Sequence, residues 1–127
     1  MLDKICLLFV FAWFLIGGIG HFAGAEFFAS IVPPYVPQPK LMVMVSGVFE
    51  LLGAAGILYR PTRKAAAWSL FLLTLCVTPA NVYMWQHPEL FAKIPPIMLS
   101  IRLVLQLVLL AAIVRVAGSA TRANQTG

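Results

Sequence analysis

The sequence has 127 residues, of which 61% are hydrophobic and only 10% are charged, and its formal net charge is +5. Soluble domains are typically about 25% charged, so this composition argues against a soluble protein and indicates one membrane domain. The excess of Lys and Arg does not indicate nucleic-acid binding, because these residues are few and lie at the ends of apolar runs, where they signal topology.

Four apolar runs follow one another along the chain, at about residues 5–22, 41–59, 65–85 and 97–116. Each approaches the roughly 20 residues that a membrane-spanning helix needs. The first run is long for a signal peptide and lacks a small-x-small cleavage site, so we expect it to be a retained helix. Short connections make neighbouring helices antiparallel. The sequence therefore predicts an all-α integral membrane four-helix bundle of up-down topology over residues 1–116, followed by a flexible C-terminal tail at 117–127.

The distribution of Lys and Arg predicts the orientation. One side of the membrane would hold Lys4, Arg60, Arg63, Lys64, Arg115 and Arg122, and the other side only Lys40 and Lys93. By the positive-inside rule, both termini lie in the cytoplasm and the chain is a multi-pass protein of the cell (inner) membrane.

The two longer loops, which would face outward, resemble each other. Residues 26–34 read EFFASIVPP and residues 89–96 read ELFAKIPP, a similarity that fits either a duplicated helical hairpin or chance. An acidic start, aromatic residues and a Pro-Pro stop favour a short interfacial helix in each loop. Two roles then stay open for the aromatic residues of the first loop, which are Phe27, Phe28 and Tyr35. Either they line a loop that dips back into the apolar part of the membrane, or they form a lid over the outer mouth or a contact with a partner.

Glu50 lies near the middle of the second run, where a carboxylate costs roughly 2.5–3.5 kcal/mol. Polar residues of the other runs share one helical face each, with spacings of three or four residues. We expect these faces to turn inward and to form one polar cluster, in which Arg102 pairs with Glu50. The expected members are His21, Ser46, Glu50, Asn81, Arg102 and Gln106. Two interpretations stay open: interhelical hydrogen bonds that only hold the fold, or a site that also holds a ligand or proton.

The third run adds Thr74 and Thr78 to this polar face. Proline has no N–H, so Pro79 frees the carbonyl of Leu75, unless it simply kinks the helix. No CxxC, CxxCH, phosphate loop or Ser/His/Asp set is present, so the sequence predicts no metal and no cofactor. An enzymatic role stays uncertain, and a non-catalytic one is favoured.

Five segments resemble the DoxX-like family of small membrane proteins: GIGHF at 18–22, IVPPYVPQP at 31–39, SGVFELLGAAGIL at 46–58, TPANVYM at 78–84 and IRLVLQ at 101–106. The resemblance covers nearly all of the chain except the tail. It implies a four-helix integral membrane protein, distantly similar in layout to the acetylcholine-receptor chaperone NACHO. The family's polar positions fall on His21, Glu50, Asn81, Arg102 and Gln106. This chain has Val104 where the family often has proline, so we expect a straighter fourth helix.

Three functions follow as expectations. The favoured one is a binding or accessory protein with an outward-opening pocket between the second and fourth runs, where Glu50 and Arg102 hold a lipid, a quinone or a similar amphiphile. One alternative is a subunit of a quinone-linked membrane oxidoreductase in which Glu50 relays protons. The other is a membrane-protein assembly chaperone of the NACHO type. Expected partners are the bilayer, such a ligand, and a membrane protein or a second copy of the chain.

Overall fold

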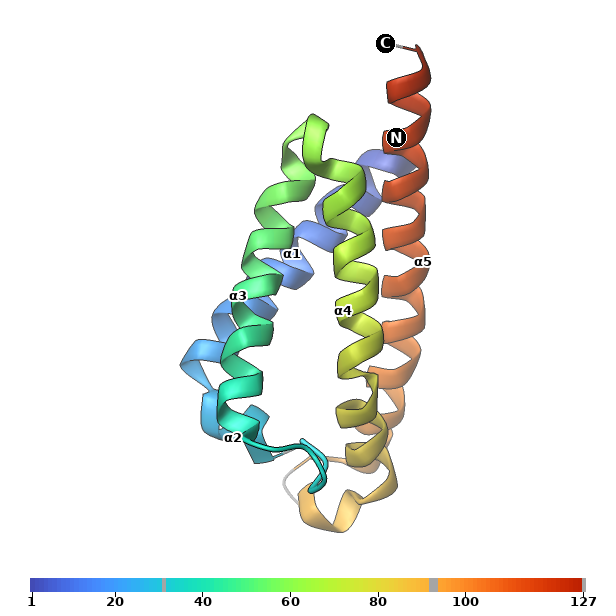
Figure 1. The fold of residues 1–127 in the computed structure, drawn as a ribbon. Coiled ribbons are helices and arrows are strands. Elements are labelled where there is room, and N and C mark those ends of the chain that lie inside the picture. The colour runs from blue at the N-terminus through green and yellow to red at the C-terminus, as the bar shows by residue number, and fades with distance from the viewer. Residues whose placement is uncertain (31, 92–93, 127) are drawn as a thin grey trace.

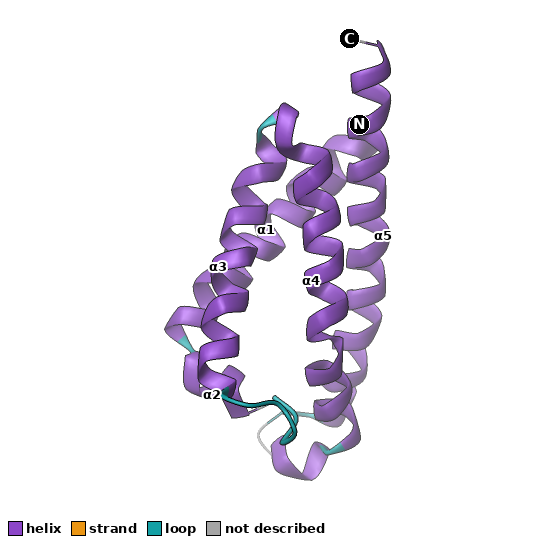
Figure 2. Cartoon of the chain, viewed as in Figure 1, coloured by secondary structure: helices purple, strands orange, loops and turns teal. Residues whose placement is uncertain are grey.

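The computed structural model describes residues 1–30, 32–91 and 94–126, and all of its regular elements are helices (Figures 1 and 2). They are α1 (Leu2–Ala23), α2 (Ala25–Ser30), α3 (Pro39–Leu58), α4 (Arg60–Gln86), the 3-10 helix η1 (Pro88–Phe91) and α5 (Pro96–Thr126). The predicted all-α class is therefore confirmed over the described residues. The repeated loop segments form α2 and η1, while their residues 31, 92 and 93 lie outside the described part.

Four helices are long and apolar enough to cross a membrane: α1, α3, α4 and the part of α5 at Pro96–Arg122. Large aliphatic side chains are exposed on their outer faces, for example those of Ile16, Leu52 and Leu107. Exposed apolar surface on this scale marks contact with something other than water. These features suggest a multi-pass membrane protein.

Prolines set where the helices begin. Pro39 and Pro61 occupy the first turns of α3 and α4, and α5 starts at Pro96, positions where the missing N–H costs nothing. The segment at 60–64, expected as a loop, is instead the first turn of α4. Its side chains reach back to α3: Thr62 Oγ1 donates to the Gly56 carbonyl at 2.7 Å, and Arg63 Nε donates to the Ile57 carbonyl at 2.6 Å. These bonds satisfy the last carbonyls of α3, which lack partners within the helix.

The C-terminal segment was expected to be a flexible tail, but α5 continues through residue 126. Two observations account for the difference. Ala117 and Ala120 are buried against the other helices. Asp3 of α1 accepts a hydrogen bond from Arg115 Nε at 2.9 Å and lies 3.4 Å from Arg122 Nη2. Contacts across the whole length of the chain thus extend the helix.

The long helices pack side by side. α3 contacts α1 and α4, α5 contacts α4 and α1, and α2 lies against α3. Both termini and the α3–α4 turn lie at one end, and α2 and η1 lie at the other (Figure 1). The larger apolar core, which includes Phe14, Ile57, Leu70 and Ile113, occupies the end near the termini. A smaller one around Met84 and Leu99 lies near η1. The polar side chains discussed below lie between these two cores along the helices.

Candidate functional site

Glu50 pairs with a histidine of the neighbouring helix. His21 Nδ1 of α1 lies 3.3 Å from Glu50 Oε2 of α3, and Glu50 is only 7% exposed. Neither of these two atoms makes a hydrogen bond within the described residues. We call His21 and Glu50 the acid–imidazole pair. An acid beside a base removes the need to bury an isolated charge, because either an ion pair or two neutral groups leaves the pair with no net charge.

Glycines bring these two helices close enough for the pair to form. A Cβ on Gly47 would lie 2.9 Å from His21 Cβ, and one on Gly18 would lie 2.8 Å from the Leu51 side chain. Bare glycine surfaces let membrane helices approach at the backbone. The ring of Phe28 from α2 stands edge-on to the imidazole, with the centroids 4.5 Å apart. Phe28 also packs against the smaller apolar core, so it covers His21 and joins the two sides of the fold.

A second polar group links α4 to α5. Arg102 Nη2 donates to Asn81 Oδ1 at 3.0 Å, Asn81 Nδ2 donates to Gln106 Oε1, and Gln106 Nε2 donates to Thr78 Oγ1. Thr78 Oγ1 in turn donates to the Thr74 carbonyl at 2.8 Å. We call Arg102, Asn81, Gln106 and Thr78 the amide network. Spacings of three and four residues put its members on facing sides of the two helices, where they hydrogen-bond one another.

The expected single cluster is therefore two groups, and the Glu50–Arg102 pair does not form. Gly53 faces Leu70 across α3 and α4, so Glu50 is level with about Thr74. Asn81 bonds Arg102 across α4 and α5. Arg102 thus lies roughly seven residues farther toward α2 than Glu50, or about 10 Å at 1.5 Å per residue. The main packing partners of α3 are also α1, α2 and α4 rather than α5.

The remaining expected residues have distinct positions. Ser46 lies one turn before Glu50, is partly buried, and belongs to neither the acid–imidazole pair nor the amide network. Phe27 is exposed and packs edge-on against Phe28, with the ring centroids 5.4 Å apart. Tyr35 is 77% exposed. From the sequence, Thr78 is predicted to lie on the polar face but not to belong to the site. Its position directly before Pro79 was a signal that could have identified it as a site residue.

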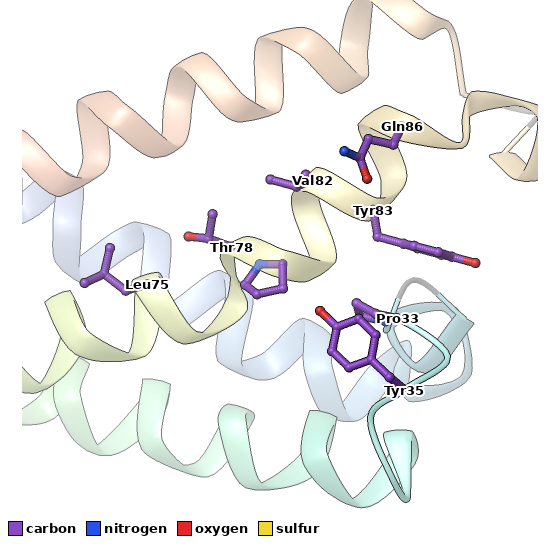
Figure 3. A pocket seen from close by; sticks show the side chains of 8 residues that line it. Pro33, Tyr35, Leu75, Thr78, Val82, Tyr83 and Gln86 are labelled. Carbon is purple, nitrogen blue, oxygen red and sulfur yellow. The ribbon is translucent and has the colours of Figure 1, made fainter.

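A pocket of about 450 Å³ runs along α4, and its walls are mostly apolar (Figure 3). It differs from the pocket expected between the second and fourth runs, because α4 and the α2–α3 linker form it. We call it the α4 pocket. Its lining residues are Pro33, Tyr35, Leu75, Thr78, Pro79, Val82, Tyr83 and Gln86. Thr78 belongs to both the pocket and the amide network. In Figure 3, Pro33 and Tyr35 of the linker lie opposite Tyr83 of α4.

A second pocket, of about 490 Å³, opens between the end of α1 and the beginning of α3. Glu26 and Lys40, two charged residues, contribute to its lining together with Phe22 and Met44. Both charged side chains are exposed. The lining of this pocket therefore carries charged groups, in contrast to the mostly apolar walls of the α4 pocket.

No curated protein and no solved structure matches the chain. A family model described as a domain of unknown function, DUF8561, matches residues 10–117. That range includes the acid–imidazole pair, the amide network and the α4 pocket. The match covers well over half of the sequence, and the chain therefore belongs to the DUF8561 family.

Proposed function

We propose that the protein is a multi-pass protein of the cell membrane whose long helices form an antiparallel up-down bundle, with both termini in the cytoplasm. Four apolar helices of sufficient length support this. The charges support the orientation, because six of the Lys and Arg residues belong to the end with the termini and the α3–α4 turn, against Lys40 among the described residues at the other. α2 and η1 then lie at the outer interface.

We propose further that it is a non-catalytic binding or accessory protein that holds a lipid, a quinone or a similar amphiphile in the α4 pocket. The observation that carries this proposal is the joining of an apolar pocket to a partly buried polar network through Thr78. Ligand sites are typically apolar cavities of roughly 300–1,000 Å³ with a few placed polar groups, and about 450 Å³ falls in that range. An amphiphile would place its chain between α4 and the bilayer and its head at Thr78.

In this proposal the two polar groups have different roles. The amide network holds Thr78 in a fixed orientation at the pocket wall, while Arg102 anchors the network from the far side. The acid–imidazole pair holds α1 against α3 and does not touch the ligand. In this proposal Thr78 anchors the ligand, instead of Glu50 and Arg102 as expected from the sequence.

The DoxX-like relationship also stays a proposal. It is supported by the fact that all five polar positions carried over from that family belong to the acid–imidazole pair or the amide network.

Filling the pocket tests the binding function. Val82→Trp places an indole in the α4 pocket, and Val108→Trp makes the same change on the exposed face of α5, where Val108 is 51% exposed. Native mass spectrometry and lipid extraction of the purified proteins should find a bound small molecule in the wild type and in Val108→Trp, and much less of it in Val82→Trp. Equal amounts of that molecule in both variants, each of them folded, would refute the proposal.

The exposed aromatic residues near α2 favour a second candidate, an assembly chaperone. Phe27 and Tyr35 are 43% and 77% exposed, and exposed aromatic residues are frequent anchors in protein interfaces. Affinity purification from cells should then recover a membrane protein with the wild type and lose it with Phe27→Ala or Tyr35→Ala. Binding of the same protein to Val108→Ala is the matched control, and equal recovery with all variants would exclude this role for the two residues.

A further inference from the structure

The second pocket carries both signs of charge. The end of α1, the first residues of α2 and the beginning of α3 form it, and we call it the α1–α3 pocket. Glu26 from α2 and Lys40 from α3 are the two lining residues with charged side chains, and the walls are nearly as polar as they are apolar. A carboxylate and an ammonium group from two different helices thus contribute to one pocket of about 490 Å³.

Neither of these two charges is used within the protein. The side chains of Glu26 and Lys40 take part in no ion pair and no hydrogen bond within the part of the chain that the structure describes. Both side chains are exposed, so both are available to a ligand. A simple anion would be attracted by Lys40 but repelled by Glu26, and a simple cation the reverse. The pair therefore favours one molecule that carries both charges.

An apolar strip leads from this pocket toward the middle of the long helices. Phe22 of α1 and Met44 of α3 line the pocket, and both are exposed. About one turn nearer the middle, Ile19 of α1 and Val48 of α3 are exposed as well. Residues three or four apart share one face of a helix, and α1 packs against α3. These four side chains, which we call the α1–α3 strip, therefore offer an apolar surface directly next to a charged pocket.

We propose that the α1–α3 pocket binds the head group of a zwitterionic phospholipid with a primary ammonium group, such as phosphatidylethanolamine, in preference to an anionic phospholipid. Lys40 pairs with the phosphate, Glu26 accepts hydrogen bonds from the ammonium group, and an acyl chain lies along the α1–α3 strip. The inference rests on the proposed placement of α2 at the outer interface, which brings this pocket to the level of the lipid head groups. It does not depend on a ligand in the α4 pocket.

Two phospholipids with identical acyl chains test the inference. Phosphatidylethanolamine and phosphatidylglycerol share the phosphate, but only the first has an ammonium group. The purified full chain would be mixed with equal amounts of both lipids in detergent micelles, and native mass spectrometry would give the ratio of bound phosphatidylethanolamine to bound phosphatidylglycerol. For the wild type we expect phosphatidylethanolamine in about 2- to 5-fold excess, the range that one exposed ion pair supports.

Charge variants attribute the preference to the pocket. Glu26→Lys should reverse the ratio, because two positive charges in the lining favour the anionic lipid. Glu89→Lys is the matched control, since Glu89 of η1 is also exposed and lies at the same end of the molecule, but belongs to the lining of neither pocket. That variant should keep the wild-type ratio. Lys40→Gln should lower the amount of bound phosphatidylethanolamine about 2- to 5-fold, whereas Lys64→Gln, an exposed lysine at the opposite end, should not.

The outcomes separate this inference from the function proposed for the α4 pocket. A wild-type ratio of one would refute the inference, and so would equal shifts with Glu26→Lys and Glu89→Lys, because net charge alone then explains them. An unchanged ratio in Val82→Trp would support the α1–α3 pocket, even if the α4 pocket holds no ligand. Loss of the preference in Val82→Trp would place the lipid in the α4 pocket and overturn the inference. If Glu26→Lys does not fold, Glu26→Gln should bring the ratio to one and Glu89→Gln should not.

Discussion

The close approach of α1 and α3 at Gly47 makes a quantitative prediction for Gly47→Ala. The added Cβ would lie 2.9 Å from His21 Cβ and 3.3 Å from the Gly18 carbonyl oxygen. Neither atom can rotate away, because both are fixed to the helix backbone, so the two helices must separate. Overpacking of this kind costs about 1–3 kcal/mol. Alanine's higher helix propensity returns about 0.8–1.0 kcal/mol, so the net loss should be up to about 2 kcal/mol.

Gly118→Ala is the matched control. Its Cβ would meet nothing nearer than Arg122 Nη1 at 3.6 Å, an ordinary contact, so only the gain in helix propensity applies. Reversible unfolding in mixed micelles, titrated with SDS and followed by circular dichroism, gives both free energies of unfolding. We expect opposite signs, with Gly47→Ala less stable and Gly118→Ala more stable than the wild type. Stabilisation by Gly47→Ala would refute the close packing of α1 on α3.

Three other predictions use the same purified protein or intact cells. Asn81→Leu leaves Arg102 without its hydrogen-bond acceptor and should lower the free energy of unfolding by about 1–3 kcal/mol in the SDS titration; an unchanged midpoint would show that the amide network contributes little. Asp3→Asn weakens an exposed ion pair with Arg115 and should cost less than about 1 kcal/mol, an effect that shrinks as salt is added; a large loss independent of salt would contradict it. In a chain whose native cysteines are replaced, Tyr35→Cys should react with a membrane-impermeant maleimide on intact cells, while a cysteine in the α3–α4 turn should not; the reverse pattern would invert the proposed orientation.

Hydropathy located the four long helices to within a few residues, except at two places. Residues 60–64 were expected to form a loop, because charge and proline suggest one, yet Pro61 fits the first turn of α4. Residues 117–126 were expected to form a flexible tail, because they are small and polar. In the structure they continue α5, and Asp3 reaches Arg115 and Arg122 of this helix from the opposite end of the chain. Local patterns do not contain such distant contacts.

For the polar residues, too, the sequence predicted local placement correctly but not every contact between helices. Helical spacing correctly gathered Asn81, Arg102 and Gln106 on facing sides of two helices, and these residues do bond one another. It also placed Glu50 on the inner face of its helix. The choice of His21 as the partner of Glu50, instead of Arg102, did not follow from spacing.

The sequence by itself determined which segments are helical, which side of each helix is polar, and which residues can donate or accept hydrogen bonds. Periodicity reports the angle of a side chain around its own axis, and that is a local property. Only the tertiary structure decided which helices are neighbours and how far each is shifted along the next. Those shifts are set by close packing at points such as Gly47 against His21 and Gly53 against Leu70. Such packing depends on the shapes of two surfaces at once.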